Sequence, residues 1–332
     1  MNITVIVCTY NRAETLAKTL DSLAASILPE PISWEVLVVD NNSHDQTREV
    51  VEEFCHRYPG RFRYLFEPQQ GLSHARNTGI REAQGDVLAF TDDDVILEPA
   101  WLQNLTAALH NSEWAGAGGR IVALWTRPIP SWLSTDDPRV MGPFVAFDPG
   151  TEAGPLTRPP YGANMAFRRQ VFEKHGVFRA DLGRSGNNLQ GREDIEFGNR
   201  LLAAGERLRY EPHAIVRHLV PESRMQKGYV LRWWFWYGRT EVADSGPPSD
   251  SRWRVGGVPL YLVRRLARWM LQWMIPTSAS RHFTCRLNIY YLAGITVACY
   301  QWARRQNAQG TVVRGATNSN PEREPSQSRT RM

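Results

Sequence analysis

The first hundred residues alternate short apolar runs with helical patterns, and this alternation constrains the fold more than any other feature. The helical pattern after the first run places Leu16, Leu20 and Leu23 on one stripe. Strands that alternate with helices form parallel βαβ units. We therefore expect an α/β domain with a mixed, mainly parallel sheet flanked by helices. The apolar runs that predict its strands are residues 3–8, 35–39, 63–66 and 87–90.

Polar side chains follow these predicted strands at the point where each strand ends. They occupy Thr9 to Arg12, Asp40 to Ser43, and the triplet Asp92 to Asp94. Ligands of such sheets bind beyond the carboxyl ends of the strands. Three adjacent carboxylates repel one another, and a bound cation with a preference for oxygen ligands would relieve that repulsion. The triplet therefore predicts a cation site, with a solvated acidic turn as the alternative.

Three further candidate features lie downstream. The pair Glu193-Asp194 begins a predicted helix and follows the glycine-rich loop 182–191. Gly162 precedes another predicted strand, and His218 ends an apolar run. Each feature also has a purely structural explanation: capping of a helix N-terminus by acids, a strand with a glycine bulge, and a histidine satisfied within the core.

Four sequence strings, taken together and in order, carry a family resemblance. VIVCTYNR, VLVVDNNSHDQT, GLSHARNTGI and GDVLAFTDDDV resemble the nucleotide-binding half of the family-two glycosyltransferases, which have the GT-A fold. The resemblance implies a catalytic domain over residues 1–228, with a nucleotide-binding half (1–100) and an acceptor half (101–228). It also implies an inverting enzyme that depends on a sugar nucleotide and on Mn²⁺ or Mg²⁺.

The resemblance also assigns roles to individual residues. Asp194 would be the general base, with Glu193 as a supporting acid. Asp94 and His218 would bind the metal ion, and Gly162 and Asn164 would line the wall between donor and acceptor. The residues expected to bind the nucleotide are Thr9, Tyr10, Arg12, Asp40, Arg76, Asp92 and Asp93.

The composition changes from residue 229 onward, and we predict an aromatic and arginine-rich helical region over 229–305. From Arg252 to Asn320 the chain has no Asp or Glu. The segment 261–275 predicts a helix with Arg264, Arg265 and Arg268 on one face and apolar side chains on the remainder, which is typical of a helix lying on an anionic membrane surface. The alternative is that this helix packs on the catalytic domain and its arginines are solvated.

The uncharged run 289–302 is shorter than the roughly twenty residues that span a bilayer, so we expect it either to insert partly or to pack on the preceding helix. The tail 306–332 is polar, and we expect it to be disordered. No signal-peptide pattern precedes the first strand, and the four cysteines form no metal or disulfide pattern. We expect a cytoplasmic protein at the cytosolic face of the membrane.

Three functional classes remain. The first is a glycosyltransferase that uses a nucleotide sugar, with UDP favoured because Asp40 suits a pyrimidine N–H, and a glycan or lipid-linked acceptor in cell-surface polysaccharide synthesis. The second is a nucleotidyltransferase, which would usually carry a glycine-rich phosphate loop that VCTYNRAETLAK lacks. The third is a non-catalytic membrane-associated binding protein. We expect no nucleic-acid partner. Acceptor choice would reside in the loops 126–148 and 182–191.

Overall fold

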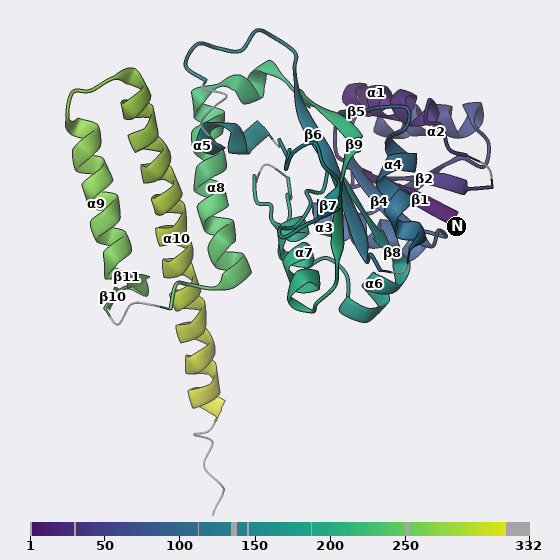
Figure 1. Cartoon of the computed structure of the whole chain (residues 1–332). Coiled ribbons are helices and arrows are strands. Elements are labelled where there is room, and N and C mark those ends of the chain that lie inside the picture. Colours follow the sequence, from purple (N-terminus) through teal and green to yellow (C-terminus); the bar gives the residue numbers. More distant parts are fainter. Residues whose placement is uncertain are drawn as a thin grey trace, which may run out of the picture.

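The computed structural model describes most of the chain: residues 2–29, 31–111, 113–133, 138–144, 146–186, 188–249 and 253–316, with the backbone alone for 138–139 and 307–316. The loops 126–148 and 182–191 each include residues outside this description. Residues 317–332, which make up most of the predicted tail, also lie outside it. A twisted sheet with helices packed around it forms one part of the molecule, and a layer of long helices forms the other (Figure 1).

The N-terminal half has the predicted alternation of strands and helices. Leu16, Leu20 and Leu23 of the first helix are fully buried, which confirms the predicted apolar stripe. The elements are β1 (Asn2–Thr9), α1 (Ala13–Ala24), β2 (Ser33–Asp40), α2 (Thr47–Arg57), β3 (Phe62–Phe66), α3 (Leu72–Glu82), β4 (Val87–Asp92) and β5 (Val95–Leu97).

The second half of the sheet domain completes the sheet. Its elements are α4 (Trp101–Ala107), β6 (Gly116–Trp125), α5 (Pro138–Met141), β7 (Gly154–Pro155), β8 (Asn164–Arg168), α6 (Arg169–His175), α7 (Glu193–Ala203) and β9 (Leu208–Val220). Short 3-10 helices cover Ala108–His110, Gly142–Phe144 and Glu222–Met225.

Within the described residues the sheet has nine strands in the order β3-β2-β1-β4-β8-β6-β9-β5, with β7 paired to β9. The long ladders are parallel, and β8 joins the two halves through short antiparallel ladders with β4 and β6. This confirms the mixed, mainly parallel sheet.

The register of the parallel strands brings the predicted polar segments together. Thr9 pairs with Asp40, and Cys8 pairs with Asp92. The ends of β1, β2 and β4 therefore lie side by side at one edge of the sheet. On the far half, His218 of β9 pairs with Val95 of β5, which follows the acidic triplet directly. Sheet topology thus carries a residue from late in the sequence to the acidic turn.

Three long helices form the C-terminal layer: α8 (Lys227–Ser245), α9 (Leu260–Met274) and α10 (Ala279–Ala316), with a small hairpin of β10 (Arg254–Val255) and β11 (Val258–Pro259) between α8 and α9. Helix α10 lies between the other two (Figure 1). The run 289–302 therefore packs within this layer. Because α10 continues to Ala316, it extends past residue 306, where we predicted that the tail begins. In the described part of the chain, no helix is both long and apolar enough to cross a membrane.

Candidate active site

A cleft of about 1030 Å³ opens where the strands β1 and β4 end. It is bounded by the acidic triplet, by the start of α7 and by one side of α8. Of the residues to which the sequence assigned a site role, the cleft is lined by Thr9, Tyr10, Arg12, Arg76, Asp92, Asp93, Asp94, Gly162, Glu193, Asp194 and His218. The fold therefore brings together most of the predicted site.

Arg12 links the acidic triplet to the loop after β1. Its Nη1 atom lies 2.9 Å from Oδ1 of Asp93 and 2.8 Å from Oδ2 of Asp94. Burial raises the pKa of Asp93, and the charge of Arg12 offsets this only in part. Burial acts on Asp94 in the same direction, but the charges of His218, Arg224 and Arg12 outweigh it and hold the pKa of Asp94 well below its usual range.

Asp92, Asp94 and His218 form a group that fits a divalent cation. One ligand atom from each lies within 4.8 Å of the others. Nε2 of His218 is 3.2 Å from Oδ1 of Asp94, and its buried Nδ1 has no hydrogen-bond partner among the described residues. Two carboxylates and an imidazole suit Mn²⁺, and carboxylate oxygens suit Mg²⁺. The candidate cation group therefore combines Asp94 and His218, the two residues expected to bind the metal ion, with Asp92 of the acidic triplet.

Arg76 and Glu193 form a buried ion pair beneath the cleft. Nη1 of Arg76 lies 2.5 Å from Oε1 of Glu193, and Nη2 lies 3.6 Å from Oδ1 of Asp92. Burial raises the pKa of Glu193 although the charge of Arg76 opposes the shift. Gly162 lies directly over this arginine, and a Cβ atom there would collide with Nη2. A side chain at position 162 would therefore force the buried guanidinium of Arg76 to shift.

Asp194 is held at the start of α7 with its carboxylate toward the cleft. Its Oδ2 accepts a hydrogen bond from the backbone N–H of Gly162 (2.7 Å), and its Oδ1 accepts one from the N–H of Ile195 (2.8 Å). The preceding Arg192 adopts φ = 73°, a left-handed conformation that turns the chain into the helix. The carboxylate is thus oriented by backbone groups, and no cation forms an ion pair with it among the described residues.

Two predicted site residues do not line the cleft. Asn164 is fully buried, and its side chain accepts a hydrogen bond from Trp101 and donates to the carbonyl oxygens of Arg120 and Ala214. Its amide therefore joins β8 to α4, β6 and β9, and its place in the donor–acceptor wall stays a prediction.

Asp40 is the other predicted site residue outside the lining of the cleft. It is buried, and its oxygens accept hydrogen bonds from the N–H of Ser43 and the hydroxyl of Tyr64, each at 2.9 Å. The next residue, Asn41, lines the cleft in its place. The predicted contact of Asp40 with a base is untested.

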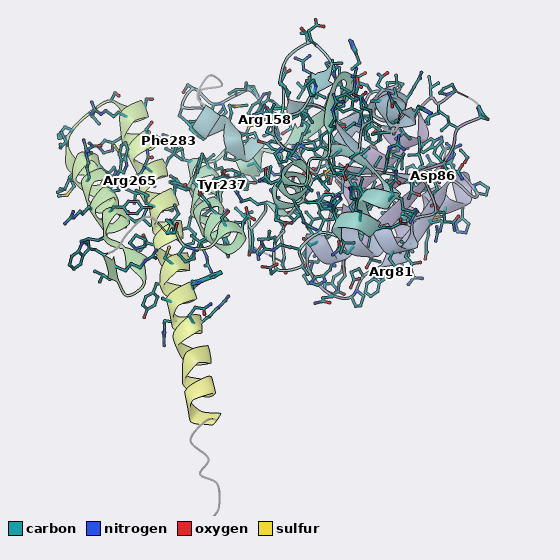
Figure 2. The ribbon with its side chains drawn as sticks, turned by 60° about the horizontal axis from the view of Figure 1, so that its bottom comes forward. Arg81, Asp86, Arg158, Tyr237, Arg265 and Phe283 are labelled. Atoms are coloured by element: carbon teal, nitrogen blue, oxygen red, sulfur yellow. The ribbon has the colours of Figure 1, made fainter. Side chains whose placement is uncertain are left out.

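The sequence did not predict that α8 forms a wall of the cleft. Trp233, Trp236 and Tyr237 line it, and the rings of Trp233 and Tyr237 stack with centroids 5.1 Å apart and planes 18° apart. In Figure 2, Tyr237 lies on the helix of the layer nearest the sheet domain, whereas Arg265 lies on the outer helix. Apolar and aromatic side chains occur all round this helix, so the sequence has no periodic signal for the face that meets the cleft.

A second missed feature joins α7 to α8. Arg192 donates to Oδ2 of Asp244 (2.8 Å) and to the hydroxyl of Tyr237 (3.2 Å). Arg179 donates to the carbonyl oxygens of Ala243 and Asp244, each at 3.1 Å. The C-terminal layer is therefore tied to the residue that immediately precedes Glu193 and Asp194.

Comparisons with known proteins agree with this geometry. The family model described as "Glycosyl transferase family 2" matches residues 4–176. The succinoglycan biosynthesis protein ExoM of Rhizobium meliloti is 32% identical over 259 residues, which cover 77% of this chain and 80% of that protein. The glucosyl-dolichyl phosphate glucuronosyltransferase of Haloferax volcanii is 30% identical over 263 residues, covering 76% of this chain and 80% of that protein.

Solved structures show the same fold. The mannosyltransferase PcManGT of Pyrobaculum calidifontis, in complex with GDP-Man and Mn²⁺, has a TM-score of 0.53 and 20% identity over 96% of this chain and 76% of that one. GalNAc-T7, with UDP, GalNAc and Mn²⁺, also has a TM-score of 0.53, at 19% identity over 74% of this chain and 52% of that one. The chain is a glycosyltransferase with the GT-A fold, and it belongs to glycosyltransferase family 2.

Proposed function

We propose that this enzyme transfers a sugar from a nucleotide sugar to a hydroxyl of a glycan or lipid-linked acceptor, with metal dependence and inversion at the anomeric carbon. The observation that carries the proposal is a single cleft that holds an oriented carboxylate, Asp194, together with a separate group that fits a cation, Asp92, Asp94 and His218. Inverting transfer needs these two functions apart, because one activates the acceptor and the other the leaving group.

The donor side of the site would hold the nucleoside diphosphate. Asp92, Asp94 and His218 would bind Mn²⁺ or Mg²⁺, which when bound neutralises charge on the leaving diphosphate. Arg12 and Arg224 lie beside Asp94, at 2.8 and 2.7 Å, and both line the cleft. Their guanidinium groups can bind phosphate oxygens through paired N–H donors.

Asp194 would take the proton of the acceptor hydroxyl as the acceptor oxygen forms its bond to the anomeric carbon. The bond from that carbon to the diphosphate oxygen breaks in the same displacement, and the nucleoside diphosphate leaves. Burial raises the pKa of Cys8, the thiol in the cleft, to about 12, which disfavours its thiolate, so we assign this residue no part in the displacement.

The acceptor would approach along α8. Sugar rings present C–H groups on their faces, and these pack on aromatic rings such as Trp233 and Tyr237 because the ring face carries partial negative charge. Both relatives named above act, by their names, in polysaccharide or lipid-linked glycan synthesis. A glycan or lipid-linked glycan acceptor, in the synthesis of a surface polysaccharide or glycoconjugate, follows for this chain as part of the proposal.

Helix α9 supports a peripheral position on an anionic membrane, which we place at the cytosolic face. Leu262, Leu266 and Trp269 pack toward α10, whereas another apolar stripe of the same helix is exposed to solvent. That outer stripe includes Met270, Leu271 and Met274, exposed by 50%, 65% and 73%, and arginines flank it. An exposed apolar stripe beside cationic side chains suits the headgroup region of a bilayer.

The test of the reaction is a screen of UDP-, GDP- and TDP-linked sugars with Mn²⁺, Mg²⁺ or EDTA, followed by NMR of the product. We expect donor turnover only with a divalent cation and a product whose anomeric configuration is opposite to that of the donor. A retained configuration would exclude the proposed role of Asp194.

The membrane contact has its own test. Serine substitution of Met270, Leu271 and Met274 together should abolish sedimentation with anionic vesicles, and serine substitution of the exposed Val177 in the sheet domain is the matched control. Unchanged sedimentation of the triple variant would contradict the proposal.

A further inference from the structure

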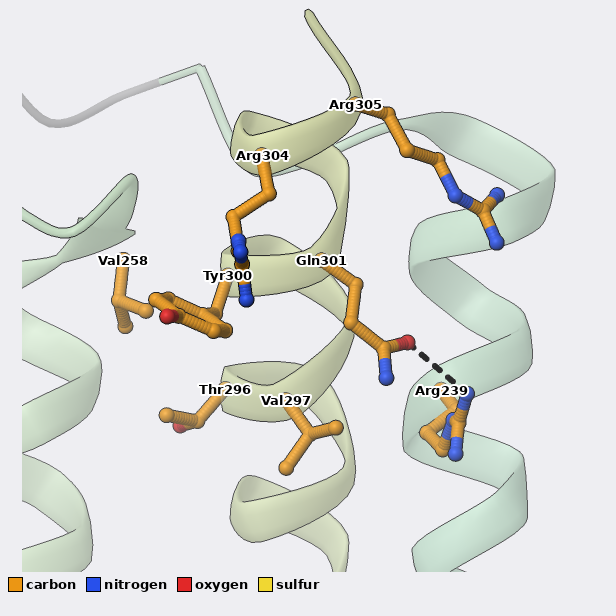
Figure 3. Close-up of a pocket in the computed structure, with 8 residues that line it drawn as sticks. All are labelled: Arg239, Val258, Thr296, Val297, Tyr300, Gln301, Arg304 and Arg305. Atoms are coloured by element: carbon orange, nitrogen blue, oxygen red, sulfur yellow. Dashed lines mark hydrogen bonds between the residues drawn. The ribbon is translucent and has the colours of Figure 1, made fainter. Parts of the chain in front are cut away.

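A groove of about 620 Å³, which we call the outer groove, lies between α8 and α10 beside β11 (Figure 3). It shares no residue with the active-site cleft. Three arginines, a glutamine and a threonine supply its polar lining, next to apolar and aromatic side chains. The lining residues are Arg239, Val258, Thr296, Val297, Tyr300, Gln301, Arg304 and Arg305.

In the part of the chain that the structure describes, the three arginines of this groove have no acidic partner. Arg239 donates to Oε1 of Gln301 (3.0 Å), and its guanidinium lies 4.7 Å from the ring centroid of Trp236. Arg304 lies 5.8 Å from the ring centroid of Tyr300. No ion pair joins any of the three to a carboxylate within the described ranges. Arg305 repels the charge of Arg239, no carboxylate of the described residues pairs with either, and an anion in the groove would relieve this repulsion.

The charge on Arg239 is affected by this arrangement. Burial lowers its pKa, and the charge of Arg305 lowers it further. A negatively charged group between Arg239 and Arg305 would raise the pKa of Arg239 and so oppose both effects. The groove therefore favours an anion over a neutral ligand.

An exposed apolar rim adjoins the groove. Gly256 and Gly257 of the β10–β11 hairpin approach Tyr300 and Ala303 of α10 closely, so the hairpin packs beside the groove. Trp253 and Val255 on the hairpin are exposed by 77% and 64%, and Tyr300 by 47%. Large apolar side chains at such exposure are typical of a surface that another apolar phase covers.

We propose that this groove binds the phosphate of an anionic phospholipid, with the apolar rim against the lipid chains. Arginine is suited to this role because its planar guanidinium donates two parallel hydrogen bonds to phosphate oxygens. Tryptophan and tyrosine are enriched at the membrane–water interface. This site deepens the proposed membrane contact and rests on it, but it does not depend on the transfer chemistry.

The test uses dihexanoylphosphatidylglycerol below its micelle concentration, titrated into the full chain by calorimetry. The variant R304K/R305K keeps both charges and loses the guanidinium geometry, so we expect binding at least about tenfold weaker. The matched variant R264K/R265K on α9 should bind as the wild type does. Unchanged binding by R304K/R305K would overturn the proposal, since diffuse attraction between charges does not distinguish lysine from arginine.

Further arms identify the source of the phosphate. Dihexanoylphosphatidylcholine, which has no net charge, should bind weakly. Inorganic phosphate that binds as tightly as the phosphatidylglycerol, and with the same loss in R304K/R305K, would show a free-phosphate site and overturn the lipid assignment. Metal-dependent donor hydrolysis should be the same in both lysine variants and the wild type. Its absence in the wild type would contradict the proposed reaction and leave the lipid result intact.

Discussion

Arginines of the active-site cleft and arginines of the outer helical layer differ in whether they pair with carboxylates. In the cleft, each of Arg12, Arg76 and Arg224 has a carboxylate within 2.9 Å. In the outer layer, Arg239, Arg304 and Arg305 have no such partner among the described residues, and apolar side chains beside them are exposed. The three cleft arginines are paired with carboxylates of the same chain, whereas the three outer arginines and the apolar area beside them are a surface that an external partner would cover.

This difference indicates what a phosphate group would have to displace in order to bind at each surface. A phosphate that enters the cleft must replace carboxylates on Arg12 and Arg224, so binding there is coupled to the cation that would take over Asp94. A phosphate that reaches the outer groove displaces no carboxylate that the structure describes. We therefore expect the cleft to need both ligands together and the outer groove to need one.

The largest expected effect is the loss of the general base. Asp194→Asn should lower transfer by about 10²–10⁴-fold, because the amide cannot take the acceptor proton. The affinity for the nucleoside diphosphate with Mn²⁺, measured by calorimetry, should stay close to that of the wild type. The matched variant Glu196→Gln changes an acid in the same turn of α7 that pairs with Arg200 instead, and it should retain activity. Full transfer by Asp194→Asn would exclude Asp194 as the base.

The next effect concerns stability in the cleft. Arg76→Met leaves Glu193 buried without its partner, and breaking a buried pair in this way costs about 3–5 kcal/mol of unfolding free energy. Urea denaturation measures it. Arg81→Met removes an exposed arginine from the same helix and should change stability by less than about 0.5 kcal/mol.

A second substitution tests the cause of that loss. Adding Glu193→Gln to Arg76→Met should restore part of the stability, because the uncompensated buried charge is then removed. A double variant no more stable than Arg76→Met would show that lost packing, and not the ion pair, explains the effect.

The contrast also explains what the sequence could predict. Strand ends were predictable because short continuous apolar runs mark the strands and parallel topology brings their ends together, as the pairs Thr9–Asp40 and Cys8–Asp92 show. The direction in which a polar side chain points was not predictable, because it depends on neighbours distant in sequence. Asn164 forms hydrogen bonds with residues of α4 and β6, and no pattern in the sequence around Asn164 indicates these partners.

The C-terminal layer was less predictable for a related reason. The helix at 261–275 was predicted from its period and is present as α9, Leu260–Met274. The sequence could not show which of its apolar residues pack on α10 and which are exposed. On α8, aromatic residues line the cleft and also contact α10, and Trp234 does both, so the composition of this helix does not distinguish the two surfaces.

A smaller effect concerns the cation. His218→Gln should weaken Mn²⁺ binding in the presence of the nucleoside diphosphate on the order of 100-fold, because one of three candidate ligands is lost while both carboxylates remain. Calorimetry measures it directly. His213→Gln, an exposed position on the same strand, is the control. Equal affinity in the two variants would remove His218 from the cation site.

The smallest effect tests the connection between the two regions. Asp244→Asn weakens the contact between α8 and Arg192, the residue that precedes Glu193 and Asp194. We therefore expect kcat to fall about tenfold, because Asp194 would be misplaced. The donor KM should change little, because Asp244 lies outside the donor side of the cleft. Asp244→Glu should restore part of kcat, and Asp181→Asn, which removes an exposed partner of Arg179, should have no effect.

A double-mutant cycle separates positioning from general weakening. If Arg192 and Asp244 act as one unit, Arg192→Gln combined with Asp244→Asn should lower kcat no further than the more severe single change does. Fully additive losses would mean that each residue acts by a different route, and the catalytic sheet and the helical layer would then be neighbours without coupling. A non-additive result would instead make the last turn of α8 part of the apparatus that positions Asp194.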